Sequence, residues 1–217
     1  MTARLFAYLG WSIVLIASAY FVYINALHYF FQYNQQSFDD FWPGYAPWLL
    51  LHITGGLIAL IIGPFQFISS IRKNYTHIHR FMGKTYLISI LIGGLASLIL
   101  SIDKMLIHEK AYTFGGGLVG LAVAWLTCSA MAYWAVRSKN FVQHREWMVR
   151  SYVVTCAFTS FRLIFRLLVE KFHVDPGQTA GLMAWACWAA PLFVTEVILQ
   201  ARKIHKGNIA LAAKQKA

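Results

Sequence analysis

Long apolar runs alternate with short polar joints along the whole sequence. Six runs stand out, at positions 5–27, 46–70, 85–102, 113–136, 151–169 and 180–201. A helix that crosses the hydrocarbon core of a bilayer needs about 20 predominantly apolar residues. The joints are too short to fold on their own. The pattern therefore predicts an all-α, polytopic membrane protein in which residues 1–217 form a single domain of six transmembrane helices.

The composition supports a bilayer as the solvent of this chain. Hydrophobic residues make up 59% of its 217 residues and charged residues only 12%, a balance that excludes an ordinary soluble domain. The net charge is +11, but the basic residues lie in the joints and form no single soluble surface. We therefore expect the lipid bilayer, and no nucleic acid, as the partner of these charges.

The distribution of lysine and arginine predicts the orientation. Fourteen of the 19 basic residues lie at the N-terminus, in the joints 72–84 and 137–150 and in the C-terminal tail, whereas the other three joints hold only three. Short loops rich in lysine and arginine stay on the cytoplasmic side. Both termini are therefore expected in the cytoplasm. Runs 46–70 and 85–102 would then form one helical hairpin, and runs 113–136 and 151–169 a second one.

A repeated motif closes both predicted hairpins. The segment 77–86, HIHRFMGKTY, has an echo in the segment 144–152, HREWMVRSY. With a one-residue insertion the aligned pairs are His79 and His144, Arg80 and Arg145, Met82 and Met148, Lys84 and Arg150, Thr85 and Ser151, and Tyr86 and Tyr152. Parallel repeats are commonly related by an axis along the membrane normal. We therefore expect His79 and His144 to be symmetry mates near the cytoplasmic interface.

Two imidazoles from two helices at one depth suit the axial coordination of a haem b iron. On this interpretation His79 and His144 are the ligands, and Arg80 and Arg145 neutralise the haem propionates. A zinc or copper ion with further ligands is an alternative. Interfacial residues that reach toward lipid phosphates are another. His77, two residues before His79, is a substitute ligand.

His52 is the second candidate for a cofactor or metal ligand. It lies near the outer end of run 46–70, and ionisable groups inside a membrane tend to be functional. A second, outer cofactor site would pair His52 with His28 or His108. The alternative is a neutral imidazole that forms a hydrogen bond with a neighbouring backbone carbonyl.

Charged residues also interrupt the last two apolar runs. Arg162 and Arg166 lie one turn apart in run 151–169, and Glu196 lies in run 180–201. Because an unpaired arginine in lipid is costly, we expect Glu196 to pair with Arg162 inside the bundle. The pair would fasten the two helices together, line a pocket for an anionic or quinone-like ligand, or transfer protons.

The chain resembles an uncharacterised, domain-of-unknown-function family of predicted bacterial inner-membrane proteins. The residues that carry the resemblance are His52 with Gly55-Gly56, the run ALIIGPFQ at 59–66, His79-Arg80 with Gly83 and Tyr86, the element HREWMVRSY, Arg162, Trp185, Trp188 and Glu196. The resemblance implies a multi-pass protein of the inner membrane and no established activity. The architecture is also loosely similar to that of b561-type cytochromes with histidine-bearing helices, which is an analogy of fold alone.

The duplicated histidines favour a membrane haem b electron-transfer protein, such as an oxidoreductase subunit linked to quinone. Two alternatives remain open. One is a cofactor-free transporter or proton or anion carrier that uses Arg162, Arg166 and Glu196. The other is a membrane assembly subunit that handles copper for a respiratory complex. The sequence contains no P-loop, no dinucleotide fingerprint and no hydrolase motif.

Overall fold

The computed structural model describes residues 2–31, 44–107 and 111–214, and the regular structure in these ranges is entirely helical. Six of the helical segments are long and apolar enough to cross a membrane. They run over Leu9–Phe31, Tyr45–Gln66, Thr76–Leu106, Tyr112–Arg137, Phe141–Phe172 and Pro176–His205. The predicted all-α architecture with six membrane-spanning segments is confirmed.

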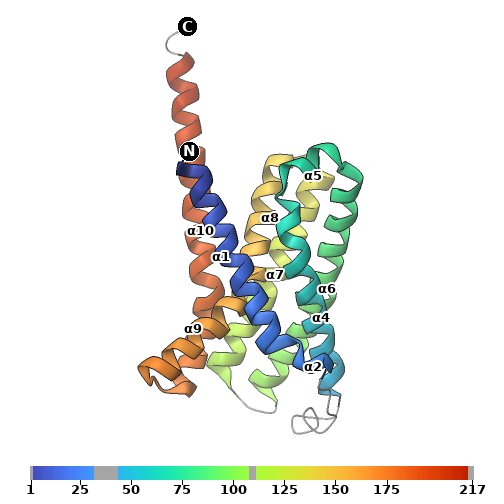
Figure 1. The fold of residues 1–217 in the computed structure, drawn as a ribbon, viewed down its shortest axis with the longest axis vertical. Coiled ribbons are helices and arrows are strands. Elements are labelled where there is room, and N and C mark those ends of the chain that lie inside the picture. Colours follow the sequence, from blue (N-terminus) through green and yellow to red (C-terminus); the bar gives the residue numbers. More distant parts are fainter. Residues whose placement is uncertain (1, 32–43, 108–110, 215–217) are drawn as a thin grey trace.

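The elements follow one another with short connections (Figure 1). In chain order they are α1 (Thr2–Phe21), the π-helical η1 (Val22–Ala26), α2 (His28–Phe31), α4 (Tyr45–Gln66), α5 (Ser69–Asn74), α6 (Thr76–Leu106), α7 (Tyr112–Arg137), α8 (Phe141–Thr155), α9 (Ala157–Phe172) and α10 (Pro176–Lys214).

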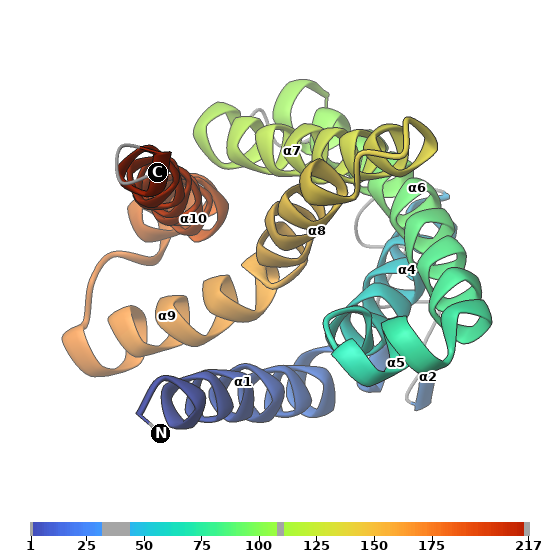
Figure 2. The ribbon, with the colours of Figure 1, turned by 90° about the horizontal axis from the view of Figure 1, so that it is seen from above.

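Four helices form the centre of the molecule. Helix α4 packs along α6, α6 along α7, and α7 along α8. Helix α10 covers α7, α8 and α9, and α1 contacts α9 at the side of the bundle (Figure 2). Short helices mark the two ends of the bundle, so we call them the α5 end and the α2 end (Figure 1).

Both basic joints of the predicted topology are largely helical. Helix α6 begins at Thr76 and α8 at Phe141, about three turns before the apolar runs that we expected to begin at residues 85 and 151. Asn140 caps α8, because its side-chain oxygen accepts a hydrogen bond from the Gln143 backbone N–H at 3.1 Å. The helices therefore extend into their polar segments, since capping and internal hydrogen bonds satisfy the backbone whatever the side chains are.

Pro64 lies two residues before the end of α4 at Gln66. It therefore ends the helix within run 46–70, where a proline inside the run would be expected only to kink it. A proline has no N–H to donate to the carbonyl four residues earlier. That carbonyl belongs to Leu60, and it accepts a hydrogen bond from the Tyr152 hydroxyl of α8 at 3.4 Å. The break in α4 thus gives α8 a point of attachment.

Helices α4 and α6 cross with their backbones in contact. A Cβ atom added to Gly55 would lie 2.5 Å from the carbonyl oxygen of Ser89 and 2.9 Å from the Cα atom of Gly93. Glycine at both positions permits this approach, as small residues do at helix interfaces in membranes. The crossing places His52, one turn before Gly55, against the backbone of α6.

Candidate functional site

His79 and His144 lie together at the α5 end of the bundle. His79 is the fourth residue of α6 and His144 the fourth residue of α8, and both side chains are half-buried. His144 is close enough to act electrostatically on the His79 ring. Two turns further along each helix, Tyr86 and Ser151 are joined by a hydrogen bond of 2.9 Å. The histidine-bearing faces of α6 and α8 are therefore turned toward each other.

The ring nitrogens of these two histidines differ in their partners. Nδ1 of His144 forms a 2.8 Å hydrogen bond with the carbonyl oxygen of Ala132 on α7. As the donor in this bond, it leaves Nε2 free to act as a ligand. Among the residues that the structure describes, the buried Nδ1 of His79 has no hydrogen-bond partner, and neither has the buried Nε2 of the nearby Gln66. A buried polar atom without a partner costs about 1–3 kcal/mol, so these two atoms indicate a place where a further group can bind.

The arginines that directly follow the two histidines lie at the surface of this end. Arg80 and Arg145 are both exposed, as is His77. Arg80 and also Arg72 lie within electrostatic reach of His79. These positive charges lie around the histidine pair at the rim of the bundle. They are placed to bind the carboxylates of an anionic group that sits there.

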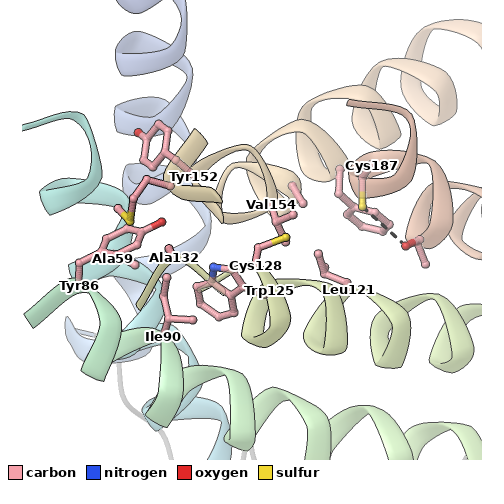
Figure 3. Close-up of a cluster of buried hydrophobic side chains, with 14 of the residues drawn as sticks. Ala59, Tyr86, Ile90, Leu121, Trp125, Cys128, Ala132, Tyr152, Val154 and Cys187 are labelled. Atoms are coloured by element: carbon pink, nitrogen blue, oxygen red, sulfur yellow. Dashed lines mark hydrogen bonds between the residues drawn. The ribbon is translucent and has the colours of Figure 1, made fainter. Parts of the chain in front are cut away.

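A chain of hydroxyl groups fills the centre of the bundle below the histidines. The Tyr86 hydroxyl, on a side chain that is 0% exposed, pairs with Ser151 at 2.9 Å and with Thr155 at 3.1 Å. Ser151 also pairs with Ser129 at 2.9 Å, and the Trp125 indole N–H donates to Thr155 at 2.9 Å. Figure 3 shows Tyr86 and Trp125 within this core. This network was not predicted from the sequence, although Ser and Thr at helical spacing within apolar runs were a signal of it.

His52 has a different environment at the other end of the molecule. Its Nδ1 forms a 3.0 Å hydrogen bond with the carbonyl oxygen of Gly93, as the backbone-carbonyl alternative predicts. The rings that face it are Trp125, at 6.3 Å between centroids, and Phe158, at 5.9 Å. Of the two expected partners, the side chain of His28 and the whole of His108 lie outside the described residues.

A cavity of about 360 Å³ opens beside His52 toward the α2 end. Much of its wall is apolar and aromatic, with Phe21, Phe114, Trp125 and Phe158 among the lining residues. The polar lining includes Thr155, Thr159, Lys104 and Arg162. The volume lies within the range of about 300–1,000 Å³ that is typical of small-molecule sites.

The predicted pairing of Glu196 with Arg162 is wrong. Glu196 accepts two hydrogen bonds from the guanidinium of Arg150 on α8, one from Nε at 2.9 Å and one from Nη2. Arg150 is only 7% exposed, stacks on the Trp147 ring at 4.6 Å and lies 3.9 Å from Glu146, which pairs with Lys203 at 2.7 Å. The sequence pattern assigned Arg150 to a joint, so its burial was missed. This network fastens α10 to α8.

Arg162 and Arg166 lie apart from that network on α9. Arg166 pairs with Glu170 at 3.1 Å and with the Tyr20 hydroxyl at 3.3 Å, and all of its partners are close to the surface. Arg162 lines the cavity and forms no hydrogen bond or ion pair with a residue that the structure describes. The three charged residues that we grouped therefore occupy three separate environments.

A bare metal ion needs more protein ligands than the two histidines supply. Among the described residues, no three His, Cys, Asp or Glu side chains gather at one point. A haem needs only two protein ligands, because the porphyrin supplies four nitrogens. The pair His79 and His144 thus suits a haem iron better than an isolated copper or zinc ion.

The comparisons with known proteins identify the family of the chain. The model of a family described as predicted membrane proteins, DUF2306, matches residues 49–199, from the second turn of α4 to the middle of α10. The chain belongs to this family. The matched part contains His52, both copies of the repeat, Arg162 and Glu196. No curated protein and no solved structure matches the chain.

Proposed function

We propose that this DUF2306 protein is an electron-transfer protein that holds haem b between His79 and His144. The observation that carries the proposal is the pair of imidazoles at the α5 end, which come from facing helices and of which His79 has a buried Nδ1 without a partner among the described residues, while His144 is bonded through Nδ1 alone in the same part of the chain. Nε2 of His144 and the ring of His79 would hold the haem iron. The bound haem would supply one-electron redox chemistry.

The residues around the pair fit this role. The hydrogen bond from His144 to the carbonyl of Ala132 fixes the ring orientation, as partners of ligating histidines do. Arg72, Arg80 and Arg145 would neutralise the propionates at the rim of the bundle. The hydroxyl chain around Tyr86 would close the floor of the site and exclude lipid from it.

The proposal includes an orientation in the bacterial inner membrane. The α5 end carries Arg72, Lys73 and Arg80 beside α6, and Lys139 and Arg145 beside α8. By the tendency of basic segments to stay inside, the α5 end and both termini would face the cytoplasm. The haem would then lie at the cytoplasmic side of the membrane.

An absorption spectrum of gently purified protein tests the proposal. We expect a Soret band that shifts on reduction with dithionite and one haem per chain by the pyridine haemochrome assay. The His79→Ala variant should lose the band, whereas His77→Ala, which changes an exposed imidazole two residues away, should keep it. A folded, colourless protein purified from haem-sufficient cells would contradict the proposal.

A further inference from the structure

The cavity at the α2 end combines an apolar wall with two polar side chains, those of Thr159 and Arg162, that have no partner among the described residues. Thr159 is the clearest of them. Thr159 lines the cavity and is only 6% exposed, and its buried hydroxyl oxygen has no hydrogen-bond partner in the part of the chain that the structure describes. A threonine hydroxyl within a helix can bond to the carbonyl four residues earlier. The hydroxyl of Thr159 is instead left for a molecule inside the cavity.

Arg162 adds a charge to the same wall. It follows Thr159 by three residues on α9, so the two side chains lie on neighbouring positions of one helix face. Its guanidinium has no partner among the described residues. A cation beside a membrane-embedded cavity favours a ligand with an electronegative oxygen, either a carbonyl or a carboxylate.

His52 provides a third polar group from the opposite helix, α4. Its Nδ1 is engaged with the carbonyl of Gly93, which fixes the ring and leaves Nε2 for a ligand. The surrounding rings of Trp125 and Phe158 offer flat apolar surfaces. The cavity therefore suits a molecule with a flat, apolar body and oxygen atoms that accept hydrogen bonds.

We propose that this cavity binds the head group of a membrane quinone, with Thr159, Arg162 and His52 as hydrogen-bonding partners of its carbonyl oxygens. The preference for an oxygen-bearing apolar molecule follows from the cavity alone. The choice of a quinone over a fatty acid rests on the proposed electron-transfer function, because a quinone is a lipid-soluble molecule that exchanges electrons.

The hydroxyl chain connects the two sites. Thr155 lines the cavity and bonds to Tyr86, which lies two turns from His79 on α6. Gly93, the partner of His52, lies about 21 Å from His79 along the axis of α6, since each residue adds about 1.5 Å. Tyr86 lies midway between them in the sequence. A haem and a quinone ring would each extend into this interval from one end.

Calorimetric titration of the full-length protein in detergent with decylubiquinone, and separately with decanoate, tests the inference. We expect saturable binding of the quinone and at least tenfold weaker binding of decanoate. Arg162→Gln should weaken quinone binding by about tenfold or more, as the loss of a charged hydrogen bond does. Arg166→Gln, one turn further on the same helix and outside the cavity, is the matched control and should leave binding unchanged.

A second pair of variants guards against misfolding. Thr159→Val keeps the shape of the side chain and removes its hydroxyl, and we expect binding to weaken about threefold to tenfold. Thr195→Val removes a hydroxyl that bonds to the Pro191 carbonyl on α10, away from the cavity, and should have no effect on binding. Equal quinone affinity in Arg162→Gln, Thr159→Val and the unmodified protein would overturn the inference.

The two proposals fail separately in this experiment. His79→Ala should lose haem and still bind decylubiquinone, because the cavity lies at the other end of the bundle. If the unmodified protein contains no haem but binds the quinone through Arg162, the electron-transfer proposal fails and the cavity assignment stands. If decanoate binds more tightly than the quinone, the quinone assignment is wrong and a carrier of anionic amphiphiles takes its place.

Discussion

The two ends of the bundle use the same device in different surroundings. At each end one histidine forms a hydrogen bond through Nδ1 with a backbone carbonyl of a neighbouring helix, His144 with Ala132 and His52 with Gly93. At the α5 end a second imidazole, that of His79, stands nearby. At the α2 end aromatic rings and a cavity take its place. The role of an imidazole whose orientation is fixed therefore depends on the groups opposite it, a second imidazole at one end and a cavity at the other.

The largest expected effect separates the two oriented histidines. Replacing His144 with alanine should abolish the haem spectrum, because it removes one of only two protein ligands. His52→Ala, which removes the equivalent imidazole at the α2 end, should keep the full spectrum. Reduced-minus-oxidised difference spectra at matched protein concentrations measure both. Loss of the band in His52→Ala as well would show that haem binding depends on both ends of the bundle.

The second effect perturbs the α2 end through the backbone. Gly55→Ala forces a methyl group into the backbone of α6, which we expect to cost about 2 kcal/mol and to displace His52. Gly56→Ala is the matched control for stability alone, since a Cβ atom there meets no atom of the described residues within 4 Å but Gly56 itself lines the cavity. Unfolding in mixed micelles with increasing denaturing detergent measures the free energy. If Gly55→Ala lost haem while it still bound the quinone, the substitution would have acted on the α5 end, and the two ends would not be independent.

The sequence predicts the membrane spans well because the hydrocarbon core imposes a length and a composition on every crossing segment. It predicts helix ends less well. Residues 76–84 and 141–150 are helical although they are rich in polar and basic residues. A helix satisfies its own backbone hydrogen bonds in lipid head groups as well as in the core, so its ends need not coincide with the ends of the apolar run.

The partners of the charged residues depend on how helices rotate about their axes, which no local pattern encodes. Glu196 was expected opposite Arg162 because both interrupt apolar runs. In the structure α10 places Glu196 beside Arg150, a residue whose basic neighbours made it resemble a joint residue. The repeat, in contrast, marked the same end of two helices with one motif, and in the structure His79 and His144 lie at the α5 end within electrostatic reach of each other.

The third effect concerns the attachment of α10. Glu196→Gln removes the negative charge that faces the buried Arg150. We expect the free energy of unfolding to fall by only about 1 kcal/mol, because the Glu196 side chain is itself 42% exposed. Glu170→Gln changes a surface pair with Arg166 and should cost less than about 0.5 kcal/mol. Thiol-reactive dyes can follow unfolding through the buried Cys128 and Cys187. Equal losses in both variants would contradict the network.

The smallest effect concerns the two tyrosines that occupy equivalent positions in the repeat, Tyr86 and Tyr152. Tyr86→Phe removes a hydroxyl that serves both Ser151 and Thr155, at 2.9 Å and 3.1 Å. Tyr152→Phe removes only a long bond of 3.4 Å to the Leu60 carbonyl, and its ring keeps its packing against Phe67 and Trp11.

We expect Tyr86→Phe to cost about 0.6 kcal/mol, the average for hydrogen bonds between membrane helices, and Tyr152→Phe to cost less than half of that. Both variants should retain haem and quinone binding, because neither hydroxyl is assigned to a ligand. Equal costs would mean that the hydroxyl chain contributes no more than an isolated bond. Loss of haem in Tyr86→Phe alone would instead make Tyr86 part of the haem site and shift the boundary between the two ends toward the centre of the bundle.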